Sequence, residues 1–60
     1  MPSDEIRRVL KLFGVAVTSL EDAIDGKAPF KKIMEWDAEL ADRTREVIGL
    51  VDRLRSRRIP

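Results

Sequence analysis

The 60-residue chain contains no cysteine, no histidine and no tyrosine. Without cysteine there are no disulfides. Without cysteine and histidine there are no thiolate or imidazole metal sites, no thiol nucleophile and not the usual general base. An enzyme built on this chain would have to use carboxylates, hydroxyls, lysines and arginines alone. We therefore expect a protein that is not an enzyme and that holds no metal and no other cofactor.

The chain also lacks an excess of either charge, because its twelve Lys and Arg residues nearly balance its eleven Asp and Glu residues and the net charge is +1. Any electrostatic partner must therefore be sought in local clusters. The length allows one domain, residues 1–60, which hides only about 60% of the surface of its unfolded chain. Small domains usually gain stability from disulfides, metals or a partner subunit, and the composition leaves the partner subunit.

Long apolar runs are absent as well. No stretch approaches the roughly 20 residues that a transmembrane helix needs, and the opening MPSDEIRR has no apolar run of the kind found in secretory signals. We expect a cytoplasmic protein without a membrane partner.

Apolar residues repeat at helical spacing over residues 3–25 and predict a first helix there. Ser3 suits the N-cap position, and Asp4 and Glu5 suit the first turn, where the helix dipole favours anions. Gly26 suits the left-handed residue that ends many helices. The apolar stripe consists of Ile6, Val9, Leu10, Phe13, Ala16, Val17, Leu20, Ala23 and Ile24.

A second helix is predicted over residues 29–58. Pro29 suits the first helical position, because its missing N–H would be unpaired there anyway, and Pro60 does not continue a helix. The second helix is the longer one, so its C-terminal turns should project past the first. Its seam repeats every seven residues at Ile33, Leu40, Val47 and Leu54, widened by Phe30, Met34, Ala41, Ile48, Val51 and Trp36.

The link at residues 26–28 is short enough to make the two helices antiparallel neighbours. The predicted fold is therefore an all-α helical hairpin. Its apolar stripes are wider than a single neighbouring helix covers, so we expect two hairpins to form a homodimeric four-helix bundle. The alternative is a monomer that docks on a larger protein. The expected core and dimer interface is Ile6, Leu10, Phe13, Val17, Leu20, Ile24, Ile33, Leu40, Val47, Val51 and Leu54.

Three polar residues lie inside the apolar arc of the second helix: Asp37, Thr44 and Arg55. If two copies of this helix crossed antiparallel near Glu46, Asp37 would face Arg55 of the other chain. Such a pair would set the register of the dimer, as polar residues do in coiled-coil seams. The alternative is that Asp37 and Arg55 simply reach water.

An acidic stripe also runs along the second helix, at Glu35, Glu39, Asp42 and Glu46. Carboxylates in a row can bind a hard cation such as Mg²⁺ or Ca²⁺. This stripe lies opposite the apolar seam, however, and Glu39 is placed to pair with Arg43 one turn later. We expect a solvated face.

Basic residues gather at the C-terminal end of the second helix. Arg53, Arg57 and Arg58, with Arg7, Arg8 and Lys11 of the first helix, are candidate phosphate contacts. The alternative is favourable placement of cations at a helix C-terminus. The function we expect is a protein–protein interaction, assembly, adaptor or regulatory module. The alternative function is an RNA- or DNA-binding regulator that uses this end.

Overall fold

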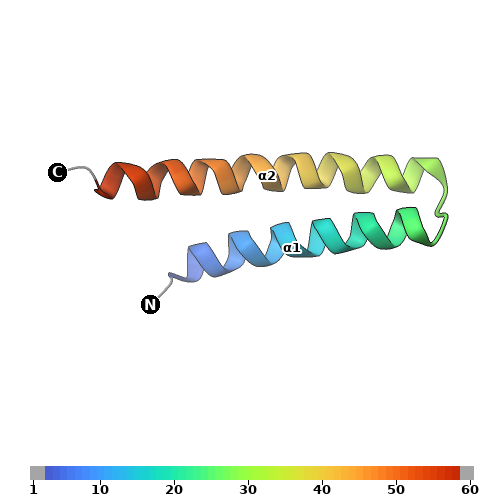
Figure 1. The fold of residues 1–60 in the computed structure, drawn as a ribbon, viewed down its shortest axis with the longest axis horizontal. Helices are drawn as coiled ribbons and strands as arrows, with labels where there is room; N and C mark the ends of the chain where they lie inside the picture. Colours follow the sequence, from blue (N-terminus) through green and yellow to red (C-terminus); the bar gives the residue numbers. More distant parts are fainter. Residues whose placement is uncertain (1–2, 59–60) are drawn as a thin grey trace.

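Two antiparallel helices make up the computed structural model, which describes residues 3–58 (Figure 1). Helix α1 covers Asp4–Asp25 and helix α2 covers Phe30–Arg58. The predicted all-α hairpin is thereby confirmed. In the described part of the chain, neither helix has an apolar segment long enough to cross a membrane.

Helix α1 begins as the sequence predicts. The hydroxyl Oγ of Ser3 accepts a hydrogen bond of 3.2 Å from the backbone N–H of Ile6, while Ser3 itself is extended at φ −71° and ψ 162°. This is an N-cap, which satisfies one of the free donors of the first turn. Asp4 and Glu5 occupy that turn, where their negative charges interact favourably with the positive end of the helix dipole.

The left-handed residue that ends α1 is Lys27, at φ 54°, and not Gly26, which lies at φ −81°. The backbone N–H of Ala28 donates to the carbonyl of Ala23 at 2.8 Å, and that of Lys27 donates to Ile24 at 3.2 Å. These two bonds form a Schellman motif in which the left-handed position falls one residue later than predicted. A lysine there carries the steric cost of a Cβ in left-handed backbone.

Space explains the glycine at position 26. Its N–H donates to the carbonyl oxygen of Asp22 at 2.8 Å, and a Cβ on Gly26 would lie only 2.9 Å from that same oxygen. Real Cβ atoms do not come so close to a backbone oxygen. Gly26 is therefore required by the close approach of the preceding turn and not by its φ angle.

Helix α2 starts one residue later than predicted. The carbonyl of Pro29 accepts hydrogen bonds from the N–H groups of Lys32 at 2.9 Å and Ile33 at 3.2 Å. Pro29 thus holds the N-cap position, whose carbonyl receives the first helical bond, and Phe30 is the first residue of α2. With 29 residues against 22, α2 extends past the start of α1, which confirms the prediction (Figure 1).

The hairpin is a single layer of two helices, with principal extents of 49, 19 and 13 Å. Each helix consequently has one neighbour, and the contact between them is thin. Among the side chains the structure describes, only Val9, Ala16 and Leu50 are buried. Ala16 is the most deeply buried of the three, at 1% exposed.

Candidate interaction surface

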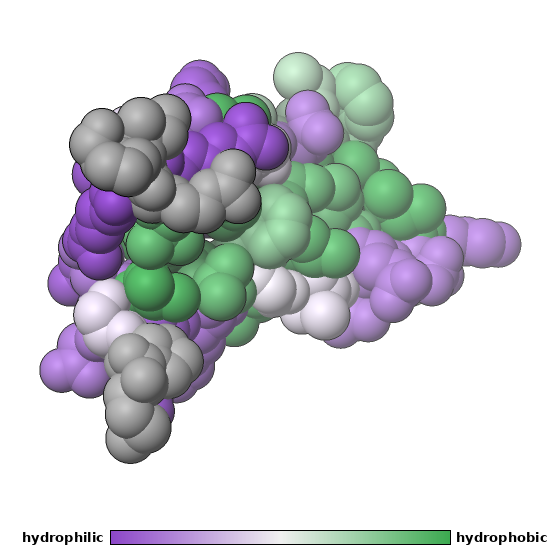
Figure 2. Space-filling view, turned by 60° about the vertical axis from the view of Figure 1, so that its left-hand side comes forward, coloured by the Kyte–Doolittle hydropathy of each residue, from purple (hydrophilic) through white to green (hydrophobic). Residues whose placement is uncertain are grey.

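One face of the hairpin carries large apolar side chains from both helices, and we call it the open face. At about 100° per residue these side chains are turned by roughly 60–120° from Val9 and Ala16 on α1 and by roughly 100–200° from Leu50 on α2, in the sense that places both sets on one side of the hairpin. Figure 2 shows apolar residues gathered in a band along this side between charged margins. The open face comprises Leu10, Val17 and Ile24 of α1 with Phe30, Met34, Ile48 and Val51 of α2, all exposed.

The exposure of this face is large for individual side chains. Phe30 is 75% exposed, Met34 56% and Ile48 55%. Single exposed apolar residues are ordinary on protein surfaces, but a contiguous band of them marks an interaction surface. The open face is therefore the candidate functional site.

The expected interface residues divide between the helix contact and the open face. Five of the eleven are exposed in the hairpin: Leu10, Val17, Ile24, Val51 and Leu54. The other six are half-buried: Ile6, Phe13, Leu20, Ile33, Leu40 and Val47. The half-buried six line the margin of the helix contact and so belong partly to each surface.

The closest part of the helix contact includes residues that the expected interface set omits. Leu50 lies seven residues after Arg43 and fourteen after Trp36, on the same line of α2. This seven-residue spacing could reveal the line from the sequence, but the charged Arg43 in its middle makes the line look polar. On α1, Val9 and Ala16 belong to the predicted apolar stripe and are its most buried members.

The candidate register residues lie on the open face. Asp37 and Arg55 are exposed and are separated by eighteen residues of one helix, which is about 27 Å. One chain therefore does not bring them together. Thr44 is half-buried, and its hydroxyl donates a hydrogen bond of 2.8 Å to the carbonyl of Leu40 in its own helix.

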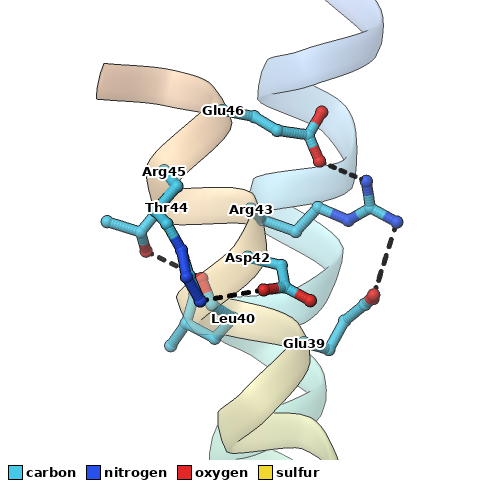
Figure 3. A network of polar contacts seen from close by, with 7 residues as sticks. All are labelled: Glu39, Leu40, Asp42, Arg43, Thr44, Arg45 and Glu46. Carbon is cyan, nitrogen blue, oxygen red and sulfur yellow. Dashed lines mark hydrogen bonds and ion pairs between the residues drawn. The ribbon is translucent and has the colours of Figure 1, made fainter. Parts of the chain in front are cut away.

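The opposite side of the hairpin carries an ion-pair network centred on Arg43 (Figure 3). Its guanidinium donates through Nη1 to Glu46 and through Nη2 to Glu39, the latter at 3.3 Å. The hydrogen bond to Glu46 raises the pKa of Arg43, and the charges of Glu39, Glu46 and Asp42 act in the same direction. Arg43 therefore stays protonated at any ordinary pH.

Every carboxylate of the acidic stripe has a cationic partner. Arg45 bonds Asp42 at 3.0 Å, and Lys32 lies 3.6 Å from Glu35. These pairs join neighbouring turns of α2 and contribute little individually because water screens them. Among the residues that the structure describes, no acidic cluster has an arrangement that could hold a metal ion.

A shallow groove of about 210 Å³ lies beside this network and is lined by Leu12, Val15, Ala16, Trp36, Glu39 and Arg43. The methylene stem of Arg43 lies against the groove while its charged head reaches the two glutamates at the rim. Arg43 thus occupies a position between the helices without burying its charge.

The basic end of the hairpin is partly neutralised. Nη2 of Arg53 donates to Oε1 of Glu5 across the helix pair at 2.7 Å. Arg7, Arg8, Lys11 and Arg57 are exposed, and the side chain of Arg58 lies outside what the structure describes. The cross-helix bond assigns one candidate phosphate contact, Arg53, to a carboxylate.

Comparison with protein-family models, with curated proteins and with solved structures finds no match to this chain.

Proposed function

We propose that the chain is a self-associating protein–protein interaction module in which the open face of one hairpin binds the open face of a second copy. The resulting homodimer would be a four-helix bundle, and its role would be that of an assembly, adaptor or regulatory module. The observation that carries this proposal is the band of exposed apolar side chains that runs over both helices.

The total surface supports the same proposal. The hairpin exposes 5003 Å², whereas a compact monomer of 6.9 kDa would expose roughly 4,000 Å² by the scaling of surface with mass. The excess of roughly 1,000 Å² is similar to the roughly 800 Å² that each partner buries in a stable interface. The excess exposed area of one hairpin is therefore large enough to form an interface with a second copy.

The charges support this proposal over nucleic-acid binding. Arg53 is bonded to Glu5, and the remaining cations belong to a chain whose net charge is only +1. Nucleic-acid binding draws its affinity from phosphate contacts made by unpaired cations. Self-association instead draws its affinity from the apolar side chains of the open face, which are exposed in the single hairpin.

Sedimentation equilibrium across a range of concentrations tests the proposal. We expect about twice the 6.9 kDa of one chain at micromolar concentration, and a thermal midpoint that rises with protein concentration by mass action. A folded monomer whose midpoint is independent of concentration would overturn the proposal.

Two valines of α1 provide a matched pair of variants. Val17 lies on the open face and Val15 beside the groove on the other side, with exposures of 40% and 47%. We expect Val17→Lys to dissociate the dimer, because it places a charge in the apolar contact. Val15→Lys introduces the same charge on the same helix and should leave the dimer intact. Equal effects of the two variants would contradict the assignment of the interface to the open face.

A further inference from the structure

A second line of residues runs along α2 on the open face, and we call it the outer seam. Its members alternate at spacings of four and three residues, which is the a/d pattern of a heptad repeat. Five of them are exposed and Thr44 is half-buried, so no neighbouring helix of the same chain covers this line. The outer seam consists of Asp37, Ala41, Thr44, Ile48, Val51 and Arg55.

The residues of the outer seam are complementary to the same residues taken in reverse order. An acid stands at one end, a base at the other, and smaller residues in one half correspond to larger ones in the other half. We infer, on the basis of the proposed function, that two copies of α2 pair antiparallel along this seam with a two-fold axis at the level of Glu46. Asp37 then meets the partner's Arg55, Ala41 the partner's Val51, and Thr44 the partner's Ile48.

The charges select this register from the alternatives. A parallel pair would place Asp37 against Asp37 and Arg55 against Arg55, and like charges in an apolar seam are strongly disfavoured. An antiparallel pair shifted by one heptad would place Asp37 against Ile48 and Arg55 against Phe30, so that both charges would face apolar groups. A shift in the other direction would place Arg55 against Thr44 and leave Asp37 without a partner in the seam. The register about Glu46 pairs both charges and also sets small side chains against large ones.

Helix α1 is compatible with the same two-fold axis. Its line of Ile6, Leu10, Phe13, Val17, Leu20 and Ile24 also alternates at spacings of four and three residues, so it has a centre of symmetry every three to four residues, one of them between residues 11 and 12. The bond between Arg53 and Glu5 shows that these two residues lie at about the same level of the hairpin.

Counting seven residues from that bond along each helix brings residue 12 of α1 level with residue 46 of α2. One centre of symmetry of the α1 line therefore lies level with Glu46 to within about one residue, which is about 1.5 Å of helix. A two-fold axis perpendicular to both helices requires this coincidence. The contacts of α1 would then be Leu10 with the partner's Phe13 and Ile6 with the partner's Val17.

Charge reversal tests the register. Asp37→Arg and Arg55→Asp each create two like-charge contacts per dimer, and we expect each to raise the dimer Kd by about tenfold or more. The double variant D37R/R55D restores opposite charges in both contacts and should return to within about threefold of the original Kd. Circular dichroism confirms that each variant keeps its helix content.

Mixing the two single variants gives a second readout. A heterodimer of D37R with R55D has only opposite-charge contacts, whereas each homodimer has only like-charge contacts. We expect the heterodimer to dominate an equimolar mixture in native mass spectrometry. A parallel dimer would favour the same heterodimer, but in it each single variant would bind itself about as well as the original chain does, so the Kd of each single variant separates the two arrangements.

Two controls match these variants. Asp42→Arg changes the net charge of α2 as Asp37→Arg does, but Asp42 lies off the open face and pairs with Arg45. Phe30→Ala removes an exposed side chain of the open face beyond the paired segment, whereas in the register shifted by one heptad Phe30 would be covered. We expect neither control to change Kd by more than about twofold.

The outcomes separate the two proposals. A monomeric original chain contradicts self-association and the register together. A dimer that tolerates both single reversals, or that the double variant fails to restore, contradicts the register and leaves self-association intact. Weakening of the dimer by Phe30→Ala would favour the shifted register over ours.

Discussion

Removing one side chain from the middle of the open face should weaken the dimer by a predictable amount. Ile48 is 55% exposed in the hairpin, so roughly half of the burial energy of an isoleucine, which totals about 1.5–3 kcal/mol, remains to be gained in an interface. Each dimer contains two copies. Ile48→Ala should therefore cost about 2 kcal/mol per dimer, which is roughly a 30-fold rise in Kd.

Sedimentation equilibrium measures this change directly, and Val15→Ala serves as the control, because Val15 is exposed on the groove side of α1. Alanine favours the helix at both positions, so a loss of helix content would not explain a weaker dimer. An Ile48→Ala chain that dimerises as tightly as the original would refute the reasoning. A Val15→Ala chain with the same loss would also refute it, since the effect would not depend on the face.

Three further predictions concern the hairpin itself. Ala16→Leu should destabilise the fold by about 1–3 kcal/mol in urea unfolding, because Ala16 is fully buried where the helices press together. Lys27→Gly should stabilise it by about 1 kcal/mol in the same assay, because glycine removes the cost of left-handed backbone; a loss of stability would argue against the turn geometry. Replacing Arg57 and Arg58 by Gln should change stability by less than about 1 kcal/mol and should not change retention on heparin. Sub-micromolar binding of hairpin RNA at physiological salt would instead favour the nucleic-acid alternative.

The helices and their order could be predicted from the sequence because both depend on local signals. Ser3 caps α1 through its own side chain, and the apolar spacing of 3.6 residues continues without interruption to Asp25. The short predicted link at residues 26–28 then leaves few arrangements other than an antiparallel pair. The predicted position of the left-handed residue is wrong by one residue. Lys27 takes the left-handed conformation, whereas Gly26 is needed because the last turn closes tightly on Asp22.

The division of apolar residues between the two surfaces could not be predicted in the same way. Each helix has two apolar lines side by side, and periodicity does not say which line faces the neighbouring helix. In α2 the line through Leu50 faces α1, although Arg43 interrupts it, and the line through Ile48 is left open. The helix contact accommodates Arg43 because Glu39 and Glu46 form ion pairs with its guanidinium. This arrangement depends on the three-dimensional structure and not on periodicity.

The unequal lengths of the helices give the hairpin a gradient of local stability. Its closed end is held by the crossed backbone bonds of the turn, whereas the final turn of α2 extends beyond the start of α1 (Figure 1). Helical turns without a packed neighbour open at little free-energy cost, and their amides exchange rapidly with solvent. Unwinding of α2 therefore begins near Arg57, and amide protons there are lost to deuterium well before those around Leu50.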